Sequence, residues 1–391
     1  MTENPLGRPI RLLSLYPTFW PRQGGGQMVL AAIAQGLSPQ LQTTVLTRGY
    51  ADSPAFEQYE FLSVRRYTNP APEVWKDYAT GARHVSFAQK LVVTGLDVLC
   101  SLPLMYRMAR EADLIHLHFP LPLGVSALLL RALVRRPLVV TVHGNADVYE
   151  LPPAMAPVTR AVLTRADAVV SVSLDLADHL RNVMTVPNVT VIPNGVEVAD
   201  FVPGAPSETT LRLFSVSRLV PRKNVHVLVE AVRRLAAEGA PLLLRIAGTG
   251  PERDRIRQMA AGSGGCVEFV GFIDEARKRE LLTDSDLFVQ LSTREGLSIA
   301  SLEALASGVP CVVSDLPGVR EPVDAGETGW YVPDPESVDS VVATLRQVLA
   351  DRARLPEMRR RCRQVAVERY SLEKMCEGYW DVFTGLLRRR A

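Results

Sequence analysis

The sequence has little that would support a disulfide framework or a membrane span. Its five cysteines are an odd number, scattered with no C-x2-C pair, so we expect buried or incidental thiols in a reducing compartment. No apolar run reaches the roughly 18 residues of a membrane span, and the nearest, 91–105, is interrupted by Asp97 and Pro103. The first residues also lack the charged-then-apolar layout of a secretory signal. These absences predict a cytoplasmic protein.

A large charge of one sign is missing as well. The net charge is +2 and acids and bases are interspersed, so no basic stripe indicates a nucleic-acid partner. Apolar residues make up 47% and charged residues 22% of the 391 residues, which is ordinary for a soluble globular protein. Because this length favours two domains over one large core, we expect a two-domain protein without a nucleic-acid partner.

Short apolar runs alternate with helical patterns through the first half of the chain. Such alternation indicates a parallel sheet covered by helices on both faces. Residues 48–110 are less regular, and leave open an insertion or helices that face an acceptor. We expect strands at 10–16, 43–47, 61–66, 114–118, 138–142, 168–172 and 189–192, and helices at 28–37, 123–134, 157–165 and 174–183.

The alternation restarts after a proline- and glycine-containing stretch, 198–209, which we interpret as an interdomain linker. The sequence therefore predicts an α/β protein with two doubly wound, Rossmann-like parallel-sheet domains, 1–197 and 210–370, followed by a terminal helix, 371–391. In the second domain we expect strands at 211–217, 242–247, 267–270, 287–291, 310–314 and 329–332, and helices near 224–237, 251–261, 274–283, 298–306, 317–324 and 336–349.

The most informative stretch is S-D-L-F-V-Q-L-S-T-R-E-G-L-S-I-A-S-L-E-A-L-A-S-G-V-P, residues 285–310. An apolar strand leads into a tight loop with Glu295 and Gly296, and a helix follows. Gly296 lets a ligand approach the backbone, and the N–H groups at the helix start favour an anion. Glu303 lies within ~15 Å of Glu295, since a helix rises ~1.5 Å per residue. Two carboxylates that can hold sugar hydroxyls would thus flank a phosphate site, which suits a nucleotide sugar. The N–H donors belong to Leu297, Ser298 and Ile299.

This stretch resembles the Glu-x7-Glu signature of the retaining glycosyltransferases of family 4, which have the GT-B architecture of two domains facing a cleft. In that family the first Glu contacts the donor sugar and the second the nucleotide ribose, and the resemblance assigns these roles to Glu295 and Glu303. Two glutamates at this spacing are weak evidence alone, because surface helices are rich in Glu. The resemblance extends over about 190–335, with further matches at 10–37 and 138–147.

A basic pair stands earlier in the same domain. The loop S-V-S-R-L-V-P-R-K-N places Arg218 and Lys223 at the carboxyl edge of the sheet, where two cations can grip a diphosphate. Read alone, a solvated basic loop is the simpler interpretation. The pair resembles the family's Arg…Lys diphosphate clamp, which favours function, with Arg222 as a substitute. The resemblance also implies that the segments containing Gly248, Phe272 and Ile273 line the nucleotide.

A glycine loop follows the first strand. Gly24, Gly25 and Gly26 do not have the G-x-G-x-x-G spacing, so a flexible turn and a phosphate cradle both stay open. The resemblance places such a loop over the interdomain cleft, facing the donor diphosphate and the acceptor.

Three histidines end neighbouring strands of the first domain. For His116 and His118 we expect hydrogen-bonded edge residues rather than metal ligands, because no third ligand has a spacing that would fix a metal. His143 stands in T-V-H-G, which resembles the family segment whose His reaches the donor sugar. Family members often carry Asp after this His, whereas Gly144 follows here, and any role of Asp147 stays open.

The resemblance implies the activity. It indicates a retaining, metal-independent hexosyltransferase that uses no cofactor and moves a sugar from a UDP- or GDP-sugar to a hydroxyl of a sugar, lipid-linked glycan or small molecule. Arg218, Lys223 and the helix start would carry the charge of the leaving diphosphate. A nucleotide-sugar epimerase of the same architecture and an inactive binding homologue stay open. The terminal helix is implied to cross back to the N-terminal domain, anchored by Trp380 and Phe383.

A peripheral membrane contact is a further interpretation. The segment S-A-L-L-L-R-A-L-V-R-R-P, residues 126–137, is apolar with three arginines. It suits either a helix that covers a sheet and has a basic end, or contact with the anionic inner face of a membrane.

Overall fold

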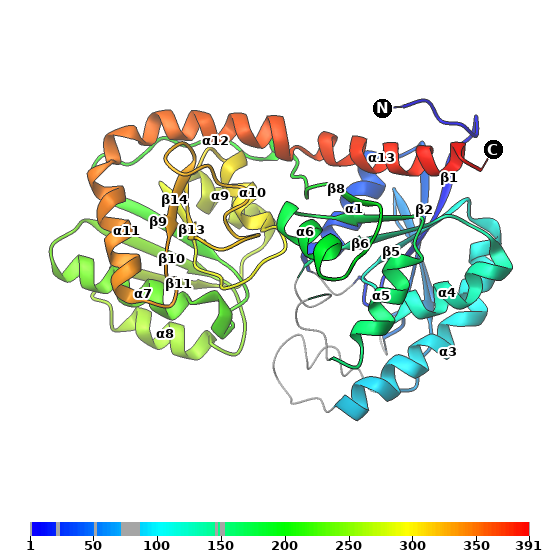
Figure 1. Cartoon of the computed structure of the whole chain (residues 1–391). Helices are drawn as coiled ribbons and strands as arrows, with labels where there is room; N and C mark the ends of the chain where they lie inside the picture. The colour runs from blue at the N-terminus through cyan, green and yellow to red at the C-terminus, as the bar shows by residue number, and fades with distance from the viewer. Residues whose placement is uncertain are drawn as a thin grey trace. The chain divides into compact units, whose positions relative to one another are not determined.

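The computed structural model describes residues 2–20, 24–50, 53–71, 87–144, 148 and 153–390. The chain divides into two units (Figure 1). The first runs to Asn194 and includes Leu372 onward, and the second spans Gly195–Ser371. The expected linker, 198–209, therefore belongs to the second unit, and the terminal helix to the first.

The described residues of the first unit form one sheet of eight strands, in the order β3-β4-β2-β1-β5-β6-β7-β8. All strands run parallel except β3, which is antiparallel to β4 at the edge. The structure confirms the strands expected from apolar runs. It adds β3, whose sequence F-E-Q is not apolar and is partly exposed. The strands are β1 Ile10–Leu15, β2 Leu41–Arg48, β3 Phe56–Gln58, β4 Leu62–Tyr67, β5 Leu114–His118, β6 Leu138–Val142, β7 Ala168–Ser171 and β8 Val189–Val191.

Two helices of this unit differ from the expectation. The described residues from 87 to 111, at the end of the irregular stretch 48–110, belong to one 25-residue helix, α3, which Pro103 does not break. The first helix begins at Gly25, three residues earlier than expected, with Gly24 as its N-cap. The helices are α1 Gly25–Gly36, α3 Phe87–Glu111, α4 Leu123–Val134, α5 Ala156–Thr164, α6 Leu174–Asn182 and α13 Leu372–Arg388.

The terminal helix α13 packs within the first unit, as the resemblance implies. Trp380 and Phe383 are fully buried, and Trp380 Nε1 donates to the carbonyl of Thr2 at 2.6 Å. A Cβ on Gly36 of α1 would lie 2.6 Å from Cys376 Sγ, so α1 and α13 approach closely at this glycine. Both expected anchors therefore hold the C-terminal helix.

The second unit contains a parallel sheet of six strands, in the order β11-β10-β9-β12-β13-β14. One expected helix is absent: residues 317–324 form turns, because Gly318 has a φ of 72°, which a right-handed helix does not allow. The strands are β9 Leu211–Val216, β10 Leu242–Ala247, β11 Val267–Gly271, β12 Leu287–Gln290, β13 Cys311–Ser314 and β14 Gly329–Val332. The helices are α7 Val225–Ala237, α8 Arg253–Ala261, α9 Glu275–Thr283, α10 Ile299–Ala306, α11 Val338–Ala350 and α12 Leu355–Tyr370, with short 3-10 turns η2 Val198–Asp200, η3 Pro221–Lys223 and η4 Arg352–Arg354.

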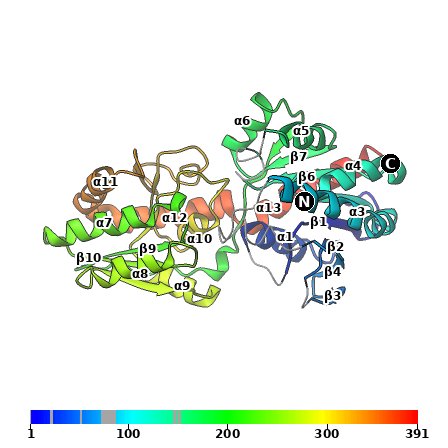
Figure 2. The ribbon, with the colours of Figure 1, turned by 90° about the horizontal axis from the view of Figure 1, so that it is seen from below.

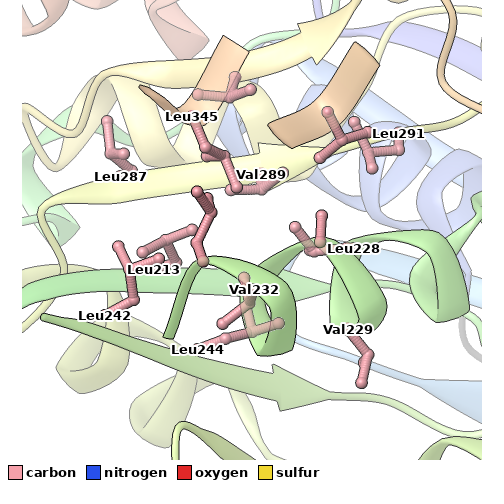
Figure 3. Close-up of a cluster of buried hydrophobic side chains, with 14 of the residues drawn as sticks. Leu213, Leu228, Val229, Val232, Leu242, Leu244, Leu287, Val289, Leu291 and Leu345 are labelled. Atoms are coloured by element: carbon pink, nitrogen blue, oxygen red, sulfur yellow. The ribbon is translucent and has the colours of Figure 1, made fainter. Parts of the chain in front are cut away.

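The core of the second unit fixes the central strands. Figure 3 shows Leu213 of β9, Leu244 of β10 and Val289 of β12 facing Leu228 and Val232 of α7, all essentially inaccessible to solvent. From β9 the chain adds β10 and β11 on one side and then returns to add β12 on the other. Ligands of open α/β sheets bind at the carboxyl ends of strands where the order reverses in this way. We therefore expect a ligand site at the carboxyl ends of β9 and β12.

Candidate active site

Two oppositely charged side chains meet at the carboxyl ends of β9 and β12. Lys223 Nζ forms an ion pair with Glu295 Oε1, and the two side chains are 12% and 15% exposed. The loops that carry them are also tied together, because Thr293 N donates to the carbonyl of Arg222 at 2.9 Å and Arg222 Nη1 to that of Arg294 at 2.9 Å. Arg218 lies exposed in the same loop after β9. The structure thus brings together the predicted Lys223 and Glu295, while Arg222 has a structural contact of its own.

The residue after Lys223 constrains the backbone next to the lysine. Asn224 adopts a left-handed conformation with a φ of 50°, which asparagine tolerates better than most residues. Its buried Nδ2 donates to the carbonyl of Leu291 at 3.0 Å, at the end of β12. Asn224 ends the η3 turn and starts α7. The backbone that carries the Lys223 side chain is therefore constrained on its C-terminal side.

Glu295 is held by a residue that the sequence reasoning missed. Gln290 Nε2, at the end of β12, donates to Glu295 Oε1 at 3.0 Å. Its Oε1 accepts from the hydroxyls of Ser298 at 2.5 Å and Ser301 at 2.8 Å. Because two hydroxyls occupy the oxygen, the amide must present its N–H groups to the carboxylate. The available signal was one polar residue in the otherwise apolar strand L-F-V-Q-L.

Glu295 and Glu303 differ in their electrostatic surroundings. Burial alone raises the pKa of Glu295, but the Coulomb attraction and hydrogen bond of Lys223 outweigh it, and the pKa is lowered. This carboxylate is therefore ionised. For Glu303 burial prevails over the ion pair with Lys278, at 2.8 Å, and the pKa is raised. Lys278 of α9 also pairs with Glu275 at 2.8 Å and was not predicted as part of the site.

The helix start expected at Ser298 is confirmed. Ser298 is the N-cap of α10, and its Oγ accepts from the N–H of Ser301 at 3.2 Å. The preceding Gly296 and Leu297 are buried. No acidic residue occupies the first turn of α10, so the partial positive charge of the helix start is not neutralised by its own side chains.

Two glycines let the loops after β9 and β10 pack backbone to backbone. Gly248 has a φ of 139°, and a Cβ there would lie 1.9 Å from the carbonyl oxygen of Ser217. At Gly250, with a φ of 151°, the distance to the carbonyl oxygen of Leu219 would be 2.3 Å. The glycine requirement at both positions thus comes from contact with the loop that carries Arg218.

Phe272 and Ile273 follow the end of β11. Phe272 is 76% exposed, which is unusual for a phenylalanine without a partner surface. Ile273 is half-buried. Both belong to the same carboxyl edge as the loops after β9, β10 and β12, because these four strands are neighbours in the sheet.

In the first unit, His116, His118 and His143 form a histidine stack at the ends of β5 and β6. The rings of His118 and His143 lie 5.1 Å apart and nearly parallel, with His118 Nδ1 2.9 Å from His143 Nε2. His116 Nε2 lies 2.8 Å from Thr141 Oγ1, which confirms hydrogen-bonded strand-end residues. Burial lowers the pKa of His116 and of His143 to about 3 and that of His118 well below its usual value. All three rings are therefore neutral near pH 7.

No group of three His, Cys, Asp or Glu side chains that could hold a metal ion occurs in the described ranges. Asp147 lies outside the described residues. Gly144, directly after His143, is half-buried.

The glycine loop proves to be a helix start. Gly24 is extended and serves as the N-cap of α1, while Gly25 and Gly26 form its first turn. A Cβ on Gly26 would lie 2.5 Å from Tyr16 Oη and 3.3 Å from the ring of Phe119. Gly26 is therefore needed for close packing on the end of β1, and these glycines start α1 instead of forming a loop before a helix at residue 28.

Comparisons with known proteins identify the family of this chain. The family model described as "Glycosyltransferase Family 4" matches residues 23–200, and the one described as "Glycosyl transferases group 1" matches residues 199–369. The chain is 32% identical over 241 residues to WcaL of Salmonella typhimurium, whose name assigns it to colanic acid biosynthesis; the match covers 57% of this chain and 58% of that protein. It is 30% identical over 247 residues to the phosphatidyl-myo-inositol mannosyltransferase of Mycolicibacterium smegmatis, covering 62% and 63%. Each match thus spans less than two thirds of the relative.

Solved structures support the fold. Sucrose-phosphate synthase from Thermosynechococcus elongatus superposes with a TM-score of 0.81 at 19% identity, over 97% of this chain and 100% of that one. Anabaena HepE in complex with UDP-glucose gives a TM-score of 0.73 at 19% identity, over 96% and 100%. At such identities the likeness shows the fold alone, and it confirms the predicted GT-B class.

Proposed function

Because the chain belongs to family 4 of the glycosyltransferases, we propose that it moves a sugar from a nucleotide-diphosphate sugar to an acceptor hydroxyl with retention of configuration. The observation that carries the proposal is the Lys223–Glu295 pair at the carboxyl ends of β9 and β12. It sets a cation for phosphate beside an ionised carboxylate for sugar hydroxyls. A UDP- or GDP-sugar fits these charges. Anabaena HepE, which is similar in fold, has a crystal structure in complex with UDP-glucose, which supports this donor class.

The donor's diphosphate would be bound by Arg218, Lys223 and the start of α10 at residues 296–299. Arg218 supplies a planar fork and Lys223 a point charge, and the N–H groups at the helix start add partial positive charge. These groups can carry the charge of a leaving diphosphate without a metal or another cofactor. Lys223 is paired with Glu295. Diphosphate binding would thus draw Lys223 away and release the carboxylate for the sugar.

The nucleoside would occupy the same sheet edge. Glu303, which the family resemblance assigns to the ribose, is buried beside Lys278, and a carboxylate held in this way can accept from ribose hydroxyls. The exposed ring of Phe272, with the backbone of Gly248 and Ile273, would contact the base. Phe272 gives this proposal a physical basis, since burying such a ring under a base removes apolar surface from water.

The proposed chemistry is displacement on one face of the sugar. The bond from the anomeric carbon to the diphosphate oxygen breaks as the acceptor oxygen approaches the same face, and the leaving phosphate oxygen takes the acceptor's proton. Glu295 positions the sugar through its hydroxyls. His143, neutral because burial lowers its pKa, would bond a sugar hydroxyl or offer its carbonyl to the developing positive ring. We propose that the acceptor belongs to glycan, polysaccharide or glycolipid synthesis in the cytoplasm.

A panel of nucleoside diphosphates tests the donor site. We expect UDP or GDP to raise the melting temperature through mass action, and expect the Arg218→Ala variant to lose most of that shift. The matched control is Arg257→Ala, on the exposed face of α8, which should keep it. If no nucleoside diphosphate stabilises the wild-type protein, the proposed donor is wrong. Proton NMR of the product's anomeric signal then distinguishes retention from inversion.

A further inference from the structure

The helix α3 is apolar enough to resemble a membrane span, yet it is fixed to the sheet. Leu91–Glu111 is 21 residues long and contains an 18-residue window with a mean hydropathy of 1.4, so Asp97 and Pro103 do not interrupt the apolar pattern as the sequence suggested. Asp97 is buried and accepts from Tyr67 Oη at 3.1 Å and Asn69 Nδ2 at 2.5 Å, with Arg48 Nη1 3.7 Å away. This polar network binds the inner side of α3 to β2 and β4, so the helix lies on the domain.

The outer side of α3 is an exposed apolar stripe. Val92 is 61% exposed, Leu99 65% and Tyr106 37%, with exposed Gly95 and Pro103 between them. The spacing of three and four residues puts all five on one face of the helix. Such a stripe is left without a covering element in the described part of the chain.

The helix α4 extends this surface. Ser101 Oγ of α3 lies 2.9 Å from Ser126 Oγ of α4, and Arg136 Nη2 donates to the carbonyl of Arg110 at 2.9 Å. The two helices therefore run in the same direction, and Figure 2 shows α3 and α4 next to each other. Leu129 and Leu133 of α4 are 57% and 70% exposed and stand one turn apart. We name Val92, Leu99, Tyr106, Leu129 and Leu133 the α3–α4 face.

Arginines border the α3–α4 face at the C-terminal ends of both helices. Arg131, Arg135, Arg165 and Arg390 line one hollow together with Leu128. Arg107 and Arg110 are exposed on the last turns of α3. Two acids lie nearby: Asp167 pairs with Arg131 at 2.8 Å and Arg390 at 3.5 Å, and the exposed Glu111 ends α3 beside Arg110. The border therefore keeps a positive excess.

From this juxtaposition we infer that the α3–α4 face docks on the surface of an anionic phospholipid bilayer. Exposed leucine, valine and tyrosine side chains enter the boundary between headgroups and acyl chains, while the arginines contact lipid phosphates. Charge favours this occupant over a second copy of the chain, because a second copy would bring the same arginine-rich border to the contact. The inference rests on residues of the first unit and is independent of the proposed donor site.

Vesicle flotation of the full chain tests the inference. At low salt we expect binding to vesicles of phosphatidylglycerol and phosphatidylcholine, weak binding to phosphatidylcholine alone, and loss of binding at high salt. The Leu129→Ser/Leu133→Ser variant should bind at least tenfold more weakly, and Arg135→Gln about fivefold more weakly. The matched control is Leu174→Ser/Val183→Ser, whose side chains are 59% and 66% exposed elsewhere in the same unit; it should bind like the wild type.

Three outcomes would overturn the inference. They are equal binding to vesicles with and without phosphatidylglycerol, unchanged binding of Leu129→Ser/Leu133→Ser, and a dimer in light scattering that this variant dissociates. The last would mean that a second copy covers the face. Circular dichroism melting of each variant verifies that the fold is intact, so a loss of binding is not a loss of structure.

Discussion

The buried amide of Gln290 allows a sharp test of how Glu295 is held. Replacing Gln290 by Glu keeps an oxygen acceptor for the hydroxyls of Ser298 and Ser301. It exchanges the N–H donor for a second carboxylate oxygen about 3.0 Å from Glu295 Oε1. At an effective dielectric constant of 20, two unit charges about 3 Å apart repel by about 5 kcal/mol. This repulsion is enough to keep one proton on the pair near neutral pH.

The expected result is a change in pH dependence. With one proton present, the introduced carboxyl can donate to Glu295 much as the amide does. Above the pKa of the pair both groups are charged and Glu295 is displaced. The ratio of variant to wild-type sugar transfer should therefore rise as the pH falls from 8.5 to 5.5. The Gln290→Met control lacks any donor, and its loss should not depend on pH. A flat ratio for Gln290→Glu would show that this amide does not position Glu295.

Three further predictions address the site and its frame. Lys223→Ala and Glu295→Ala should each lower kcat by about 10²–10³-fold with the fold intact; near-normal turnover of both folded variants would reject the assignment. The free energy of unfolding should decrease as the pH falls, because the buried histidines of the stack take up protons only when the chain unfolds. For a buried histidine with a pKa of about 3, such as His143, and about 6.5 when unfolded, the loss between pH 7 and 5 is about 2 kcal/mol. Urea unfolding at both pH values measures it, and a pH-independent stability would contradict it. Gly248→Ala should destabilise by about 3–5 kcal/mol because a Cβ would meet a carbonyl oxygen, against about 1 kcal/mol for Gly239→Ala, where φ is also positive but space is open; equal losses in thermal unfolding would refute the steric argument.

The alternation of apolar runs was sufficient to predict the strands of both sheets except β3. A parallel strand buried on both faces is apolar along its length, so β5, β6, β10 and β14 match their expected bounds. The helix α3 could not be predicted in this way. Its buried face carries Asp97 and its outer face carries leucine and valine, so the usual polar-out pattern of a surface helix is partly inverted. Where tertiary contacts replace amphipathic patterning, periodicity alone fails.

Some residues of the site could likewise be predicted from the sequence, and others could not. Charged residues in loops at strand ends, such as Lys223 and Glu295, can be proposed from motif and position. The residues that orient them are neutral and buried, and only the fold brings them together: Gln290 ends an apolar strand, and Asn224 contacts a carbonyl 67 positions away. No local pattern distinguishes such a Gln or Asn from an ordinary polar residue.

Because Lys223 lowers the pKa of Glu295, we expect the Lys223→Ala variant to have a pH dependence of activity opposite to that of Gln290→Glu. Burial by itself raises the pKa of Glu295, and Lys223 is the main influence that lowers it. Without the lysine, the carboxyl should therefore titrate at a higher pH and be protonated more often under assay conditions. Part of the activity lost in Lys223→Ala should then return as the pH rises, whereas the part due to the missing diphosphate contact should not. If measured pH profiles of sugar transfer show Lys223→Ala regaining activity toward high pH and Gln290→Glu toward low pH, a general alkaline or acid effect on the enzyme cannot produce both.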